Sequence, residues 1–108
     1  MEDTRPKASH SRKIASFASL APGAVITFRW DNPPWDTVLQ YTAYPLTRPG
    51  MTPGDATKAV IEVVRVRLCI ERDGAGEETR YALVDVRNAG TEMCGFELFQ
   101  SWLQPLPE

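Results

Sequence analysis

The sequence predicts an all-β protein that folds as one antiparallel β-sandwich. Apolar and polar residues alternate along three runs between residues 60 and 103, as in strands that bury one face. Turn signals at residues 73–76 and 88–90 separate these runs. The 9 prolines are spread along the chain and β-branched residues are frequent, which disfavours helices. A chain of 108 residues is expected to form a single domain.

Residues 1–20 are expected to form a basic, extended arm ahead of the sandwich. They hold four basic and two acidic residues, whereas the whole chain has a net charge of −2, so the remainder is acidic. Residues 13–20 are the best helix candidate, but they are few and include two serines. Three outcomes fit the arm: a solvated terminus, a strap across its own sandwich, or a contact with a neighbouring subunit or acidic partner. The sandwich itself is assigned to residues 21–104 and a tail to residues 105–108.

Two strands are predicted in the first half of the sandwich. Residues 25–30 place Ile26, Phe28 and Trp30 on one side, and residues 37–44 have the composition of a further strand. Stacked on the three later runs, these strands would close a core.

The three later runs are expected to form a β-meander with one shared apolar face. Pairing Val66 with Val84, and Val84 with Phe96, directs the even-numbered apolar residues to the same side. Leu68 is then expected to share a dry interior with Val84 and Phe96. A shift of either register by one residue would bring charges into that interior.

The same register makes two predictions about the other side chains. Arg65 lies opposite Asp85 as a cross-strand pair. Cys94 points into the core and Cys69 points the opposite way, which is incompatible with disulfide geometry. Two free thiols are therefore expected, in agreement with a reducing cytoplasm.

The odd-numbered face of the meander is predicted to contact a protein partner. It is not fully polar, because Tyr81, Leu83 and Phe99 lie on it, and these side chains are the expected anchors. Arg12 and Lys13 of the arm are the basic contacts predicted beside them.

The segment from Trp30 to Asp36 is a second candidate site, because two tryptophans flank a proline turn. Trp35 is expected to stack on a sugar ring while Asp31, Asn32 and Asp36 bond its hydroxyl groups. The same residues also fit a structural corner with Trp30 in the core, and their oxygens form a weak calcium motif.

Catalytic machinery is not evident in the sequence. The single histidine, His10, falls in the predicted arm, where nothing would hold a nucleophile beside it. Cys69 and Cys94 do not have the spacing of a zinc motif. The glycine loop at residues 73–78 is acidic, and no helix is predicted after it. We therefore predict that the chain is not an enzyme and uses no cofactor or metal.

Hydropathy and charge restrict the location and the partners. No apolar run reaches the roughly 20 residues of a membrane-spanning helix, so no membrane insertion is expected. Serines interrupt residues 14–21, the only stretch similar to a signal peptide. The acidic body disfavours nucleic acid as a partner. The expected location is cytoplasmic or particle-associated.

Residues 82–92 contain a V-x-N-x-G-T pattern formed by Val86, Asn88, Gly90 and the threonine that follows. This pattern resembles a strand and turn of bacterial immunoglobulin-like sandwich modules of the cell-adhesion-related type. Residues 20–24 and 30–34 are similar to segments of small actinobacterial β-sandwich proteins of unassigned role. The resemblance implies an immunoglobulin-like sandwich, and the strand pattern also fits a jelly-roll-like one.

The function predicted from these observations is that of a non-catalytic binding or assembly module acting through protein–protein contacts. Self-association fits the size and the arm, and so does a place as accessory subunit of a larger particle such as a phage or an injection device. The alternative is a lectin-like, carbohydrate-binding module that uses the segment from Trp30 to Asp36.

Overall fold

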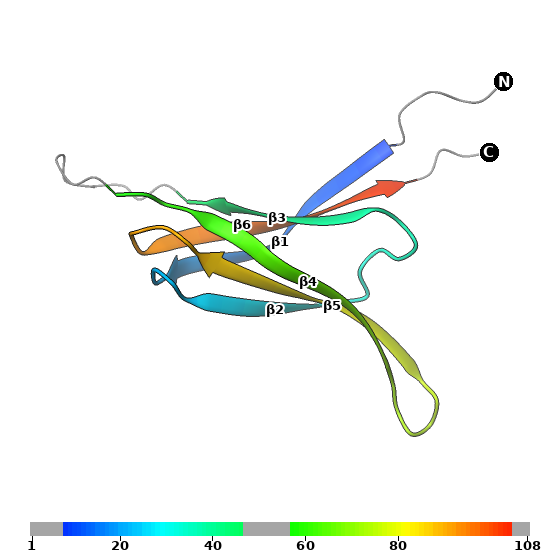
Figure 1. Cartoon of the computed structure of the whole chain (residues 1–108). Coiled ribbons are helices and arrows are strands. Elements are labelled where there is room, and N and C mark those ends of the chain that lie inside the picture. Colours follow the sequence, from blue (N-terminus) through cyan, green and yellow to red (C-terminus); the bar gives the residue numbers. More distant parts are fainter. Residues whose placement is uncertain (1–7, 47–56, 105–108) are drawn as a thin grey trace.

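The computed structural model describes residues 8–46 and 57–104, which form two packed antiparallel sheets (Figure 1). One sheet has the strand order β1-β6-β3 and the other the order β2-β5-β4. The predicted all-β sandwich is confirmed. No helix in these two ranges is long and apolar enough to cross a membrane. The strands are β1 (Ala8–Leu20), β2 (Val25–Asp31), β3 (Leu39–Pro45), β4 (Ile61–Arg72), β5 (Glu78–Asn88) and β6 (Cys94–Gln104).

Residues 8–20, expected in an arm outside the sandwich, form its strand β1. The strand pairs with β6 along its length, and the Phe17 ring stacks on Phe96 with 5.6 Å between ring centroids. The prediction of an arm is wrong for residues 8–20. It was based on the charges of Arg12 and Lys13 and gave less importance to the apolar residues that follow them. The rest of that arm, residues 1–7, and the predicted tail lie outside the described residues.

The hairpin of β4 and β5 has the predicted register. Val66 lies opposite Val84, and Arg65 lies opposite Asp85. The Asp73 carboxylate closes the connecting turn by accepting two backbone N–H groups of the loop, each at 2.9 Å. This is the local hydrogen bonding that favours aspartate in turns.

The predicted pairing of Val84 with Phe96 is wrong, because β5 and β6 belong to different sheets. Phe28 of β2 occupies the position opposite Val84 instead. Val84 and Phe96 are nevertheless both fully buried, and the Phe28 ring meets the Phe96 ring edge-on at 5.8 Å across the interior. Alternation indicates which side chains point inward, but it does not indicate which layer a strand joins.

Asn88 anchors the crossing from β5 to β6. Its fully buried side chain donates hydrogen bonds to the carbonyl oxygens of Leu20 and Glu92, both at 2.7 Å, and accepts one from the Gly90 N–H at 2.9 Å. A Cβ atom at Gly90 would collide with the backbone carbonyl of Lys58, so this position requires glycine. The asparagine and glycine of the turn are thus both needed for the change of layer.

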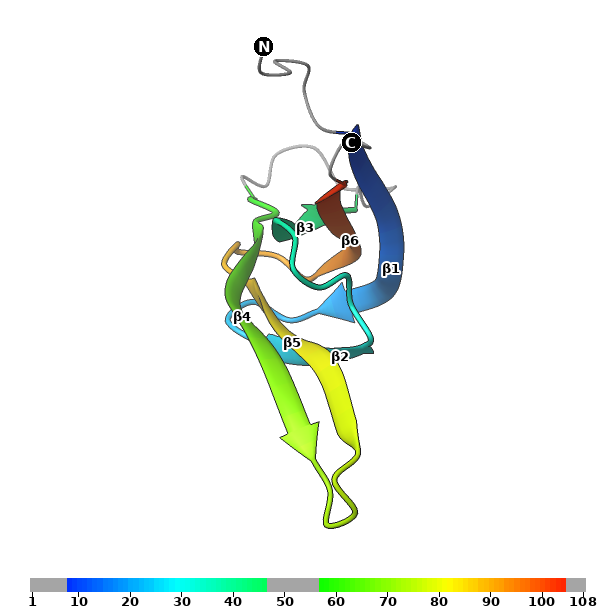
Figure 2. The same cartoon turned by 90° about the vertical axis from the view of Figure 1, so that its right-hand side faces the viewer.

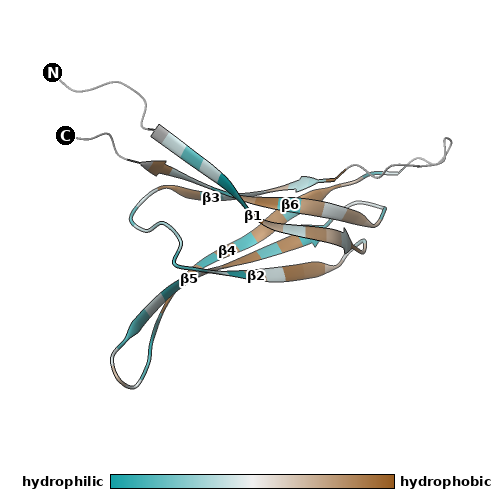
Figure 3. Cartoon of the chain, turned by 180° about the vertical axis from the view of Figure 1, so that it is seen from behind, coloured by the Kyte–Doolittle hydropathy of each residue, from teal (hydrophilic) through white to brown (hydrophobic). Residues whose placement is uncertain are grey.

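The sandwich is closed at the end near Asn88 and open at the other. Hydrophobic residues concentrate where the two layers overlap (Figure 3). At the open end the layers diverge, and the tip of the β4–β5 hairpin points away from the sheet of β1, β6 and β3 (Figures 1 and 2). The buried core consists of Leu20, Tyr41, Ile61, Ala82, Val84, Val86, Cys94, Phe96 and Leu98.

Candidate functional site

Three alternating apolar side chains of β4, which follow the register shift between Val63 and Arg65, are exposed, and we call them the β4 strip. Val66, Leu68 and Ile70 have exposed fractions of 43%, 52% and 51%. They share a face with the core, since Val66 lies opposite the fully buried Val84. The expectation that Leu68 lies in a dry interior is wrong, because this part of the hairpin diverges from the second layer (Figure 2).

The backbone of the β4 strip is also open on one side. β4 is the edge strand of its sheet within the described residues. The Asp73 N–H donates to the Glu77 carbonyl, and the register is regular from Arg65 to Arg72. Since hydrogen-bonded pairs alternate in an antiparallel ladder, the odd-numbered residues of β4 bond to β5 and the strip residues direct their N–H and C=O groups outward. Such an edge is a template for another strand.

The outer face of the same part of β4 has two basic side chains followed by an acidic one. The Arg67 Nη2 atom lies 3.4 Å from a carboxylate oxygen of Asp85. The buried Arg67 Nε has no hydrogen-bond partner among the described residues. Glu71, further along the strand, raises the pKa of Tyr81 through its negative charge, with a smaller contribution from burial. Arg65 precedes these residues and is exposed.

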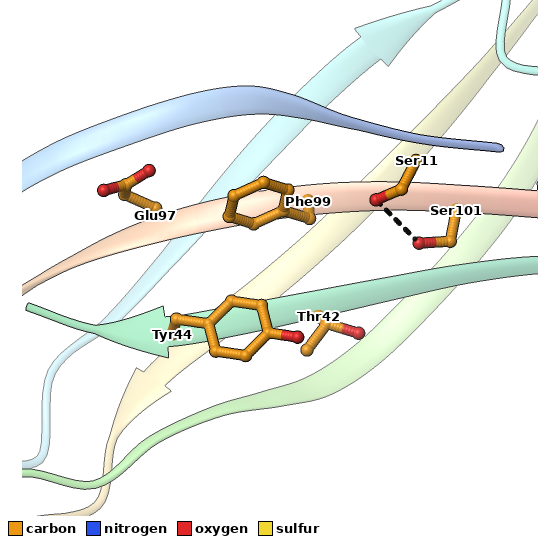
Figure 4. Close-up of a pocket in the computed structure, with 6 residues that line it drawn as sticks. All are labelled: Ser11, Thr42, Tyr44, Glu97, Phe99 and Ser101. Atoms are coloured by element: carbon orange, nitrogen blue, oxygen red, sulfur yellow. Dashed lines mark hydrogen bonds between the residues drawn. The ribbon is translucent and has the colours of Figure 1, made fainter.

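A shallow pocket lies on the outer face of the other sheet (Figure 4). Its volume is about 410 Å³. The rings of Tyr44 and Phe99 meet edge to face at 5.4 Å, and Lys13 holds the Glu97 carboxylate at 3.3 Å. The arrangement combines an aromatic surface with a carboxylate and hydroxyl groups. The lining residues are Ser11, Thr42, Tyr44, Glu97, Phe99 and Ser101.

Arg12, predicted as a partner contact, is exposed at the open end and contacts side chains of both layers. Its Nε donates to the Gln100 side-chain oxygen at 2.9 Å, and its guanidinium carbon lies 5.4 Å from the Trp30 ring centroid and 5.1 Å from that of Trp102. Gln100 in turn donates to the Tyr41 hydroxyl at 2.8 Å. Burial raises the pKa of Tyr41, and this effect outweighs the hydrogen bond from Gln100.

The other predicted partner-binding residues do not share one surface. Tyr81 and Leu83 lie on the outer face of the β2-β5-β4 sheet, whereas Phe99 lies on the outer face of the β1-β6-β3 sheet, opposite Lys13. The Arg29 guanidinium covers the Tyr81 ring at 3.8 Å. The prediction placed them together because it put β5 and β6 in one sheet.

The segment from Trp30 to Asp36 connects the two layers. The Arg80 guanidinium lies 4.9 Å from the half-buried Trp35 ring, and Asp31 pairs with Arg29 at 2.9 Å. Both side chains thus have partners within the chain. Trp30, expected in the core by the structural interpretation of the corner, is only partly buried and is not among the buried core residues.

The remaining members of that segment support the turn. Asn32 and Asp36 have φ angles of 53° and 56°, a left-handed conformation that asparagine and aspartate tolerate better than most residues. In residues 8–46 and 57–104, no group of three or more His, Cys, Asp or Glu side chains is placed to hold a metal ion. His10 lies outside the pocket and stacks on Trp102 at 5.4 Å.

Neither surface as a whole could be predicted from the sequence, although Phe99 of the pocket was an expected partner contact. The β4 strip was assigned to the core, although one signal was present: Ile70 falls opposite Arg80, so the apolar pairing of the hairpin ends there. The pocket depends on β3 lying beside β6, which brings Tyr44 next to Phe99 from distant parts of the chain. No local pattern marks that pairing.

No protein-family model matches this chain, and no curated protein or solved structure is significantly similar to it. The evidence for a function therefore comes from the geometry of these two surfaces.

Proposed function

We propose that this chain is a non-catalytic binding or assembly module that docks on a protein partner through the β4 strip. The observation that supports this proposal is the coincidence of three half-exposed apolar side chains with open backbone groups on one edge strand. Single exposed apolar residues are ordinary, but a contiguous group of them at an unpaired edge is typical of interaction sites.

The strip offers a partner both affinity and specificity. Covering the exposed half of each side chain contributes roughly 1 kcal/mol, since full burial of a Val, Leu or Ile is worth about 1.5–3 kcal/mol. A partner strand added to the edge would also bond the open N–H and C=O groups, and the alternating side chains would set its register.

Site-specific photo-crosslinking tests the proposal in the cells that make the protein. A benzoylphenylalanine residue replaces Leu68 in one variant and Val25 in the control, because Val25 is as exposed as Leu68 but stands alone on β2. We expect a discrete protein adduct from position 68 and none from position 25. Equal labelling at both positions, or no adduct at position 68, contradicts the proposal.

A second candidate function, carbohydrate binding, is favoured by the pocket of Figure 4 rather than by the segment from Trp30 to Asp36. Tyr44 is 54% exposed, and the pocket adds a carboxylate and hydroxyl groups to its ring. Aromatic rings stack on sugars while polar groups bond the hydroxyls. Calorimetric titration with a panel of sugars checks this: wild type should bind saturably and Tyr44→Ala should not, and no binding by wild type removes the candidate.

A further inference from the structure

We propose that the partner of the β4 strip is a second copy of this chain, whose β4 pairs antiparallel with the first across a two-fold axis at Cys69. This inference rests on the proposed function and specifies it. A two-fold axis perpendicular to the sheet sets each residue of β4 opposite a residue of the same parity. Even-numbered side chains, which include the β4 strip, then meet on one face, and odd-numbered side chains, which include Arg65, Arg67 and Glu71, meet on the other.

The backbone is compatible with this pairing. The strip residues direct their N–H and C=O groups toward the open edge, as the alternation from the Asp73 hydrogen bond establishes. With the axis at Cys69, Leu68 lies opposite Ile70 of the second copy, and each pair exchanges backbone hydrogen bonds. The Leu68 and Ile70 side chains of the two copies form one apolar surface, with Val66 opposite Arg72 at each end, on a sheet with the order β2-β5-β4-β4-β5-β2.

Charge complementarity selects the position of the axis. An axis at Cys69 sets Arg67 opposite Glu71 of the second copy and Arg65 opposite Asp73 of the second copy, and each pair occurs twice. Arg67, whose Nη2 atom lies 3.4 Å from a carboxylate oxygen of Asp85, thereby faces a second carboxylate. Opposite charges in directly facing positions stabilise a strand pair, whereas like charges destabilise it.

Other positions of the axis are less favourable. An axis at Arg67 sets two arginines opposite each other, and an axis at Glu71 does the same with two glutamates. An axis at Ile70 sets Leu68 opposite Arg72 and Val66 opposite Gly74, so Ile70 alone meets an apolar side chain, whereas the axis at Cys69 keeps the pair of Leu68 with Ile70 twice. An axis at Leu68 keeps the apolar pairs but sets Arg67 opposite Cys69 and forms fewer ion pairs.

Light scattering of the purified chain, combined with charge exchange, tests the pairing. We expect a mass of twice the 12.1 kDa of one chain. Arg67→Glu should weaken dimerisation at least about tenfold, because the repulsion from Glu71 acts twice across the axis, and the double variant Arg67→Glu/Glu71→Arg should restore it. The control double variant Arg65→Glu/Glu71→Arg should not. Thermal melting checks that every variant folds.

Oxidation provides a second, independent readout. In a Cys94→Ser background, diamide takes up the two electrons and two protons released as two Cys69 thiols join, and a covalent dimer should appear on a non-reducing gel. Cys69→Ser should remain a non-covalent dimer without the cross-link. The buried Cys94 is replaced only so that Cys69 is the sole thiol.

The possible results separate this inference from the proposed function. A monomer at high concentration overturns self-pairing, and an adduct from position 68 with another protein would then leave the proposed function standing. A dimer that Arg67→Glu does not weaken overturns the axis at Cys69. If the Arg65→Glu/Glu71→Arg variant dimerises like the wild type and the Arg67→Glu/Glu71→Arg variant does not, the axis lies at Leu68 and the axis at Cys69 is overturned.

Discussion

β4 and β5 are the two strands of one hairpin and have the same alternating pattern, yet their apolar faces lie in opposite environments. Ala82, Val84 and Val86 of β5 are fully buried, whereas the β4 strip is about half exposed. β5 is central in its sheet and the second layer covers it, while β4 is at the edge and its second half diverges from that layer. Alternation therefore sets the direction of a side chain, and strand order decides whether anything covers it.

The same substitution on both strands tests whether strand order decides which apolar face is covered. Val84→Ala should lower the free energy of unfolding by about 2 kcal/mol, because it removes buried methyl groups and leaves a cavity. Val66→Ala, directly opposite in the register, should change it by less than about 0.5 kcal/mol, as expected for an exposed site. Denaturant unfolding measures both, at concentrations low enough to keep the chain monomeric.

Val25→Ala is the matched control for this pair, since Val25 is exposed on a different strand of the same sheet. Its effect should equal that of Val66→Ala. If Val66→Ala instead lowers the free energy of unfolding as much as Val84→Ala at low concentration, the β4 strip is covered within a single chain. The strip would then not be a docking surface.

Much of the fold could be predicted from the sequence, because local physics determines it. Alternation and a turn with Asp73 suffice to pair Val66 with Val84 and to direct Cys94 inward. The change of layer between β5 and β6 could not be predicted in the same way. Val84 and Phe96 point inward whether they are neighbours in one sheet or lie in opposite layers, so the parity of the pattern is identical in the two cases.

The candidate site was less predictable, because it depends on tertiary neighbours. Arg12 is exposed, as expected for a charged residue, but its guanidinium contacts the rings of Trp30 and Trp102 and the side chain of Gln100. Trp35 was expected to stack on a sugar ring or to form part of a structural corner, and the Arg80 guanidinium lies over its ring. In both cases the partner comes from a distant strand, and nothing near the residue in sequence indicates it.

Tyr41 and Tyr81 both have a raised pKa, but Tyr41 is in a covered region and Tyr81 in an open one. Tyr41 lies in the core and accepts a hydrogen bond from Gln100, whereas Tyr81 lies on the outer face of β5. Tyr41→Phe should lower the free energy of unfolding by about 1 kcal/mol, because it leaves the Gln100 amide without its acceptor. Tyr81→Phe should have a smaller effect, since no buried polar group loses its partner.

Alkaline titration should separate the two tyrosines further. Burial raises the pKa of Tyr41 in the folded chain, so the protonated phenol stabilises the fold fully below about pH 10, where the unfolded tyrosine titrates, and this contribution is lost as pH rises through the folded value. The Glu71 charge raises the pKa of Tyr81, so its contribution has the same sign but is screened by salt. Unfolding measured from pH 8 to about pH 11 should therefore show a decline that Tyr41→Phe reduces at any salt concentration, and that Tyr81→Phe reduces only at low salt. If the free energy of unfolding declines with pH in Tyr41→Phe as it does in wild type, water reaches the Tyr41 hydroxyl. The space between the diverging layers would then extend as far as Tyr41.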